Sequence, residues 1–301
     1  MASASRHIVG MLVGGGPAPG INSVISAVTI RSILGGSDVL GFVDGFKWLM
    51  EGNREHRHPL SIEEVSRIHF RGGSHLGTSR ANPTKKPEHL DRVLSTLTSL
   101  GVTRLVTIGG DDTAFSALKL EARSQGRIQV VHVPKTIDND LDLPHGIPTF
   151  GFQTARHYGV EIVKNLMVDA RTTSRWYLTV TMGRKAGHLA LGIGKAAGTT
   201  LTIIPEEFVE RPVKLRRLVD AVIGTMIKRF ESGRTDGVIV LAEGLIEIID
   251  QDDLGGLEHV ERDEHGHLRL SEVDIGDLLR REVTSALKAL GLSVTVVSKN
   301  V

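Results

Sequence analysis

Short runs of apolar, often β-branched residues alternate along the chain with longer stretches whose apolar residues recur at helical spacing. This alternation is typical of a parallel sheet with helices on both faces, because strands that are buried on both sides read as continuous apolar runs. The strands predicted in this way are Ile8–Val13, Val39–Val43, Arg104–Ile108, Ile128–Val133, Trp176–Thr181, Thr200–Ile204, Gly237–Ala242 and Ser293–Val297. The pattern therefore predicts an α/β fold.

The helices are marked by their ends as well as by their periodicity. From Pro87 to Leu100 one face is apolar, proline suits the first turn, and Gly101 can take the left-handed conformation that ends many helices. A second helix, from Glu282 to Leu290, is predicted to end in the same way on Gly291. A chain of 301 residues favours two domains, which we expect to comprise residues 1–145 and 146–301.

Composition excludes several classes of function. Hydrophobic residues make up 40% of the chain and charged residues 24%, as in ordinary globular proteins. A net charge of +1 and an aromatic content of 4% argue against nucleic acid as a partner, and no apolar run approaches the roughly 18 residues that span a membrane. The absence of cysteine rules out disulfides, thiolate metal sites and cysteine nucleophiles. We expect a cytoplasmic protein that recognises anions locally.

A polar, turn-rich stretch extends from Ile249 to Leu270, and we interpret it as a surface loop. Its histidines His259, His265 and His267 suggest a metal site, but nothing in their spacing places them on one face. The chain stops at Val301, four residues after the last predicted strand. We expect from this that the sequence lacks a C-terminal part.

A glycine-rich loop, Gly14 to Gly20, follows the first strand and opens a helix. Its consecutive backbone N–H groups and the helix N-terminus suit an anion such as phosphate. The loop is neither G-x-G-x-x-G nor a P-loop, which requires a lysine and a hydroxyl residue after its last glycine. A tight turn that needs glycine for steric reasons is the alternative interpretation.

Two adjacent carboxylates, Asp111 and Asp112, follow Gly109 and Gly110 at the carboxyl end of the strand Arg104–Ile108. Open α/β sheets bind their ligands at this edge. An N-cap role explains one aspartate, whereas the pair favours Mg²⁺ held near phosphate oxygens.

The segment Pro134 to Asp140 follows the next strand and carries an ammonium group, a hydroxyl and two carboxylates. A carboxylate can accept the proton of an attacking hydroxyl, and a lysine can neutralise charge on a transferring phosphoryl group. An acidic turn with an incidental lysine is the alternative. Beside the preceding carboxylate pair, this segment predicts phosphoryl transfer.

Three further groups fit the same chemistry. A second glycine-rich loop runs from Gly72 to Arg80, and the segment Met182 to His188 places two cations after the strand Trp176–Thr181. Arg175 precedes that strand, and Glu243 follows the strand Gly237–Ala242. Arginine matches phosphate in a bidentate way, and a carboxylate suits a substrate hydroxyl.

In their order and spacing, these motifs resemble the phosphofructokinase family over essentially the whole chain. The resemblance implies two Rossmann-like three-layer domains with mainly parallel sheets, a phosphoryl-donor domain at residues 1–145 and a fructose-phosphate domain at residues 146–301. It implies Mg²⁺ as cofactor, held by Asp111, and fructose 6-phosphate as the acceptor in glycolysis.

The donor-binding residues implied are Gly15, Gly16, Arg80, Gly110, Asp112 and Thr113. The catalytic residues implied are Lys135, Thr136, Asp138 and Arg184. The acceptor-binding residues implied are Thr136, Ile137, Asp138, Asp140, Arg175, Met182, Gly183, Arg184 and Glu243.

Two positions indicate the phosphoryl donor. The family resemblance links Asp112 and Lys135 to members that use pyrophosphate, whereas ATP-using members carry glycine at both. Physical reasoning agrees, because a carboxylate at position 112 repels and displaces the α-phosphate of a nucleotide, and Lys135 supplies positive charge to pyrophosphate.

The resemblance also implies a homodimer or homotetramer, since Arg175 matches an arginine that reaches the sugar phosphate of a neighbouring subunit. Family members continue past Val301 into a segment that grips the 6-phosphate. Two alternatives remain open: an ATP-dependent 6-phosphofructokinase, and a non-catalytic regulatory subunit of the same fold.

Overall fold

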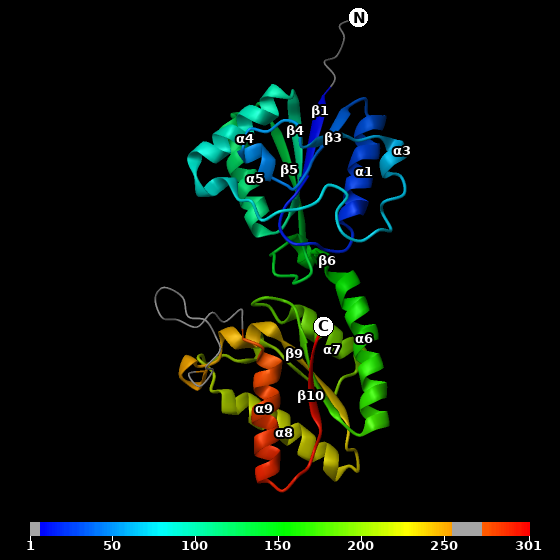
Figure 1. The fold of residues 1–301 in the computed structure, drawn as a ribbon, viewed down its shortest axis with the longest axis vertical. Coiled ribbons are helices and arrows are strands. Elements are labelled where there is room, and N and C mark those ends of the chain that lie inside the picture. Colours follow the sequence, from blue (N-terminus) through cyan, green and yellow to red (C-terminus); the bar gives the residue numbers. More distant parts are fainter. Residues whose placement is uncertain (1–6, 255–272) are drawn as a thin grey trace, which may run out of the picture. The chain divides into compact units, whose positions relative to one another are not determined.

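The computed structural model describes residues 7–254 and 273–301 and divides the chain into two compact units (Figure 1). The first unit runs to Thr136 and resumes at Leu141–Gly151, and the second contains Ile137–Asp140 and continues from Phe152. The three histidines considered as metal ligands, His259, His265 and His267, lie outside the described residues.

The first unit contains a six-stranded sheet in the order β3-β2-β1-β4-β5-β6. All neighbouring strands are parallel except β2 and β3, which are antiparallel. The strands are β1 (Ile8–Val13), β2 (Asp38–Phe42), β3 (Arg57–Pro59), β4 (Val102–Gly109), β5 (Gln129–Thr136) and β6 (Phe150–Gly151). Because parallel strands end at one edge, the loops that follow β1, β4 and β5 lie at the same edge of this sheet.

Helices cover both faces of the first sheet, as Figure 1 shows for α1 and α3 on one side and α4 and α5 on the other. The helices are α1 (Ile21–Leu34), α2 (Lys47–Met50), α3 (Ile62–Val65), α4 (Pro87–Ser99) and α5 (Asp111–Ser124), with short 3₁₀ turns at Pro83–Lys85 and Pro144–Gly146. Successive strand residues alternate between two cores, so that Met11 packs toward α1 whereas Leu12 packs toward α4.

The second unit contains a four-stranded, all-parallel sheet in the order β10-β7-β9-β8. Its strands are β7 (Trp176–Thr181), β8 (Leu201–Ile203), β9 (Gly237–Ala242) and β10 (Val296–Asn300). Its helices are α6 (Phe152–Thr173), α7 (His188–Ala197), α8 (Leu215–Glu231) and α9 (Ile275–Ala289), with 3₁₀ turns at Pro205–Glu207, Glu243–Glu247 and Gln251–Leu254. One core lies against α8 and α9 and the other against α6 and α7, so this sheet is also the middle of three layers.

The α/β prediction is confirmed, and β1, β7 and β9 have the predicted bounds. The last strand is Val296–Asn300 rather than Ser293–Val297, and its helix α9 begins at Ile275 rather than Glu282. Asp274 explains the earlier helix start, because its side chain accepts a hydrogen bond of 3.0 Å from the Asp277 N–H.

Two other features of the structure differ from the sequence prediction. The strands β3 and β6 were not predicted, because three and two residues are too few to show a period. Ile249 and Leu254, expected in a surface loop, are 3% and 0% exposed in the core beneath α8. None of the described helices combines the length and the apolar character that crossing a membrane requires.

Candidate active site

In the first unit, backbone hydrogen bonds join the loop after β1 to two other segments. The Gly14 N–H donates to the Ile108 carbonyl at 2.8 Å, and the Gly15 N–H donates to the Ser79 carbonyl at 2.8 Å. The Thr78 hydroxyl donates to the Gly15 carbonyl at 2.7 Å. The two glycine-rich loops predicted from sequence therefore lie side by side at the carboxyl edge of the sheet.

Steric limits explain Gly14, in the loop after β1, and Gly109, the last residue of β4. A Cβ at Gly14 would lie 2.4 Å from Thr113 Oγ1, and one at Gly109 would lie 2.4 Å from Thr113 Cβ. Thr113 is only 5% exposed and fills the space between the loop after β1 and the end of β4. Gly16 differs, because a Cβ there would meet no atom within 4 Å. The space beside Gly16 is thus open to a ligand.

The second glycine-rich loop is anchored by side chains from elsewhere in the unit. The buried Asn22 accepts from the His75 N–H at 2.7 Å and donates to the Arg71 carbonyl at 3.0 Å. The Ser79 hydroxyl donates to the Asp44 carbonyl at 2.6 Å. Arg80, at the end of this loop, is exposed and available to an anion.

Lys135 lies at the end of β5 and is 5% exposed. Its ammonium group donates a hydrogen bond to the Gly16 carbonyl. The positive charge therefore lies beside the loop after β1. Moving an ammonium group out of water is costly unless it is paired or hydrogen-bonded. A buried lysine at a sheet edge is therefore a candidate functional group rather than a surface charge.

The aspartate pair begins α5, directly after the Gly110 N-cap, and both side chains are exposed. β4 and β5 pair up to Gly109 and Pro134, so Asp111 and Lys135 lie near neighbouring strand ends. No group of three or more acidic or histidine side chains suitable for a metal occurs among the residues that the structure describes. This sparse set still fits Mg²⁺, which usually takes one or two carboxylates and completes its shell with water and substrate phosphates.

In the second unit, Asp138 is 7% exposed and lies beside the loop that follows β7. Its Oδ2 is 3.8 Å from Arg184 Nε, while the Arg184 side chain is 63% exposed. Arg184 adopts a left-handed φ of 49°. Such backbone strain costs on the order of 1 kcal/mol or more and persists where surrounding contacts enforce it.

Glu243 supplies those contacts. Its Oε1 accepts hydrogen bonds from the Gly183 N–H at 3.0 Å and the Arg184 N–H at 2.5 Å. A Cβ at Gly244 would lie 2.3 Å from the Arg184 carbonyl oxygen, so this approach requires glycine. Glu243 was expected to bind a substrate hydroxyl, and in this structure one of its oxygens orients the turn that carries Arg184.

His188, the first residue of α7, was not singled out by the sequence interpretation. Its Nδ1 lies 2.8 Å from the carbonyl oxygen of Asn139, the residue that follows Asp138 in the chain. Asn139 has a left-handed φ of 57°, so this contact holds a strained turn. Its place at the end of the segment Met182 to His188, shortly after a predicted strand, is the signal that could have indicated it.

The other predicted acceptor residues belong to both units, and each is described within its own unit. Thr136 ends β5 in the first unit, and its carbonyl accepts from the Thr149 hydroxyl at 2.8 Å. Ile137 packs against the core beneath α6 and α7, whereas Asp140 and Met182 are exposed.

Arg175 lies at the opposite end of β7 from Met182 and Arg184. A strand of six residues extends about 20 Å, so one bound phosphate cannot touch both ends. Near Arg175, the Tyr177 hydroxyl donates to Asp169, and this hydrogen bond raises the pKa of Tyr177, partly opposed by the Arg175 guanidinium.

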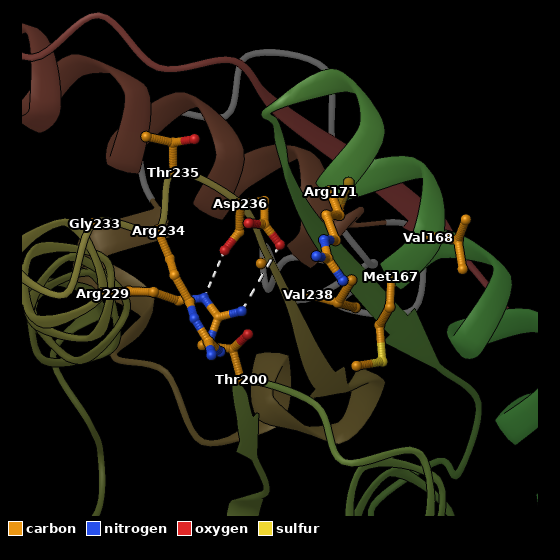
Figure 2. A pocket seen from close by; sticks show the side chains of 12 residues that line it. Met167, Val168, Arg171, Thr200, Arg229, Gly233, Arg234, Thr235, Asp236 and Val238 are labelled. Atoms are coloured by element: carbon orange, nitrogen blue, oxygen red, sulfur yellow. Dashed lines mark hydrogen bonds and ion pairs between the residues drawn. The ribbon is translucent and has the colours of Figure 1, made fainter.

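A cavity of about 530 Å³ opens at this amino end of the second sheet (Figure 2). Three arginines line it, namely Arg171, Arg229 and Arg234, and Arg229 Nε donates to the Asp236 carbonyl at 2.6 Å. None of the predicted site residues lines this cavity.

Known proteins that are similar to this chain in sequence include two phosphotransferases. The chain is 56% identical over 291 residues to the pyrophosphate–fructose 6-phosphate 1-phosphotransferase of Thermotoga maritima, which covers 96% of this chain and 69% of that protein. The enzyme of the same name from Naegleria fowleri is 51% identical over 301 residues, with coverages of 97% and 69%.

The solved structure of phosphofructokinase from Saccharomyces cerevisiae has the same fold, with a TM-score of 0.76 at 24% identity. The match covers 97% of this chain but only 38% of the yeast chain. A model of the family described as phosphofructokinase matches residues 8–297. With its two three-layer units and its loops at the carboxyl strand ends, this chain belongs to the phosphofructokinase family.

Proposed function

We propose that this chain transfers a phosphoryl group from pyrophosphate to the C1 hydroxyl of fructose 6-phosphate. The hydroxyl oxygen bonds to one phosphorus, the bridging P–O bond breaks, and the hydroxyl proton passes to Asp138. The products are fructose 1,6-bisphosphate and phosphate. The reaction is reversible and belongs to glycolysis, and we expect it in the cytoplasm.

The observation that carries the donor assignment is the buried Lys135, whose ammonium group donates to the Gly16 carbonyl. In this proposal the backbone N–H groups of Gly16 and Gly110 and the first turn of α5, with Thr113, donate to the pyrophosphate oxygens. Gly15 borders the same site, and its own N–H donates to the Ser79 carbonyl. Arg80 supplies a further positive charge. An ordered site of this kind stabilises charge on the transferring group because its dipoles need no reorganisation.

Asp111 would hold Mg²⁺, and the ion, when bound, neutralises charge on the phosphate oxygens. The exposed Asp112 beside it adds negative charge where a nucleotide would bring its α-phosphate. The combination of Asp112 and Lys135 supports pyrophosphate rather than ATP as the donor.

On the acceptor side, Asp138 is the proposed general base. Its burial and its proximity to Arg184 support this role, because a fixed carboxylate within reach of the hydroxyl accepts the proton and a guanidinium stabilises phosphoryl charge. The proposed acceptor contacts are Thr136, Ile137, Asp140, Met182, Gly183 and Glu243.

The position of Arg175 supports a homodimer or homotetramer. Because it lies at the far end of β7 from Arg184, we propose that it contacts a sugar phosphate bound by a partner subunit.

The donor assignment is tested by phosphate release and fructose 1,6-bisphosphate formation with pyrophosphate or ATP at equal Mg²⁺. We expect turnover with pyrophosphate to exceed turnover with ATP by at least about tenfold, corresponding to one lost charge-assisted contact. Asp112→Gly combined with Lys135→Gly should reduce this ratio, and Lys119→Gly serves as a surface control. Equal turnover with both donors in the parent would overturn the assignment.

A further inference from the structure

We propose that His132 is a positioning residue of the donor site: it orients the Gly109–Gly110 peptide so that the Gly110 N–H faces the bound phosphate. This inference rests on the proposed function, because it gives His132 a role in binding pyrophosphate.

His132 lies on β5 opposite Thr107 on β4, with which it is in register. Its Nδ1 is 2.9 Å from the Thr107 hydroxyl oxygen, and its Nε2 is 3.1 Å from the Gly109 carbonyl oxygen. A carbonyl oxygen only accepts hydrogen bonds, so Nε2 carries the proton and donates it to Gly109. The neutral ring then leaves Nδ1 to accept from the Thr107 hydroxyl.

Burial supports this single arrangement of protons. Thr107 is 0% exposed, and desolvation lowers the pKa of His132, opposed by its hydrogen bond with Gly109. A neutral imidazole with one donor and one acceptor satisfies both of its neighbours. The Thr107 hydroxyl thus selects the form of the ring that donates to Gly109.

The geometry of the peptide bond links the Gly109 carbonyl, which His132 holds, to the Gly110 N–H, which faces the proposed phosphate. In the planar trans peptide between Gly109 and Gly110, the C=O of Gly109 and the N–H of Gly110 point in opposite directions. The Gly14 N–H donates to the Ile108 carbonyl, so that carbonyl faces β1. Carbonyls alternate along a strand, so the Gly109 carbonyl faces β5 and the Gly110 N–H faces the loop that follows β1.

The hydrogen bond from His132 matters because the peptide that it orients lies between two glycines. Glycine has no Cβ to restrict its backbone, so the orientation of this peptide depends on hydrogen bonds. β4 ends at Gly109, and the His132 side chain adds a hydrogen bond to the last carbonyl of the strand. The residue thereby orders an N–H group that pyrophosphate needs without touching pyrophosphate itself.

The test compares His132→Gln with His132→Asn in the 301-residue chain. The Gln amide nitrogen can reach the position of Nε2 and donate to Gly109, whereas the shorter Asn amide reaches only the position of Nδ1. Isothermal titration calorimetry measures binding of magnesium pyrophosphate and, separately, of fructose 6-phosphate. We expect His132→Asn to weaken pyrophosphate binding about three- to tenfold, as losing one hydrogen bond does, and His132→Gln to restore it to within about twofold.

A second pair keeps the inference testable if His132→Asn folds poorly. Thr107→Val removes the hydroxyl that selects the tautomer, and Thr107→Ser keeps it, so only the valine variant should lose pyrophosphate affinity. Binding of fructose 6-phosphate should not change in any variant. Equal losses in the Gln and Asn variants, or parallel losses for both ligands, would show that His132 is merely structural. If the parent chain binds no pyrophosphate, the proposed function itself fails and this inference fails with it.

Discussion

Two ionisable side chains near each other in the chain, Lys135 and Asp138, are almost completely buried, at 5% and 7% exposure. Burying a charge is unfavourable unless hydrogen bonds or ion pairs replace water. Lys135 donates to the Gly16 carbonyl, and Asp138 lies near Arg184. Residues kept at such a cost are candidates for function, and this agrees with the roles proposed for them.

Replacing Asp138 tests the role of general base. Asp138→Asn keeps the size and polarity of the side chain but removes its ability to accept a proton. We expect turnover with pyrophosphate and fructose 6-phosphate to fall by roughly a hundredfold or more, while calorimetry shows nearly unchanged pyrophosphate binding. A variant as active as the parent would refute the assignment. Asp142→Asn, at an exposed carboxylate outside the proposed site, is the matched comparison.

The lowered pKa of His132 predicts a pH effect on stability. Its reference pKa is 6.5, and burial places the folded value below this. As the pH falls below about 6.5, the unfolded chain binds a proton more readily than the folded chain, so the stability that is fully present above this pH is lost. Urea unfolding between pH 5 and 8 should show a steeper loss for the parent than for His132→Gln, by at most about 1.4 kcal/mol per pH unit. Identical curves would contradict the shift.

Among the elements, the loops after β1 and β4 depend on close packing around one side chain. Thr113, in the first turn of α5, fills the space that a Cβ on Gly14 or Gly109 would occupy. The glycines of these loops therefore have two different functions. Gly14 and Gly109 allow the loops to approach Thr113, whereas Gly16 borders open space.

Alanine substitutions separate these two functions. Gly14→Ala should destabilise the fold by about 1–3 kcal/mol through overpacking, because the new Cβ would lie 2.4 Å from Thr113 Oγ1. In a Thr113→Ala background the penalty should shrink, which a double-mutant cycle by urea unfolding measures. Gly16→Ala should change stability by less than about 0.5 kcal/mol, yet weaken pyrophosphate binding. An additive cycle would show that Thr113 does not require the glycine.

For the whole molecule, the question is whether one chain forms a complete acceptor site. Arg175 and Arg184 lie at opposite ends of β7, separated by the length of the strand. Both belong to the second unit, so this separation is a property of one compact body. This separation supports the proposal that Arg175 acts on a site in a second copy of the chain.

Subunit mixing tests this proposal. Arg175→Ala and Asp138→Asn should each be nearly inactive as pure proteins. After the two are mixed under conditions that exchange subunits, activity should rise to about a quarter of the parent value for a statistically mixed dimer, because half the dimers contain one site with both groups intact. Light scattering verifies the oligomer, and unmixed proteins incubated in the same way are the control. If no activity returns, Arg175 does not act on a partner.

Much of the fold was predicted from sequence because its signals are local. β1, β7 and β9 were predicted with their observed bounds, since fully buried strands are uniform apolar runs. The two-residue strand β6 was missed, because pairing with β5 creates it and its own residues carry no period. The start of α9 was also missed, since a single capping aspartate defines it.

The sequence by itself determined which chemical groups this protein carries and in what order, because motif spacing and residue type are properties of the chain. Only the tertiary structure decided which groups meet: Lys135 with the Gly16 carbonyl, Glu243 with the backbone of Arg184, and His132 with Gly109. It also separated Arg175 from Arg184, although only eight residues lie between them in the sequence. The physical reason is that strands carry neighbouring residues apart, while pairing brings distant loops to one edge of a sheet.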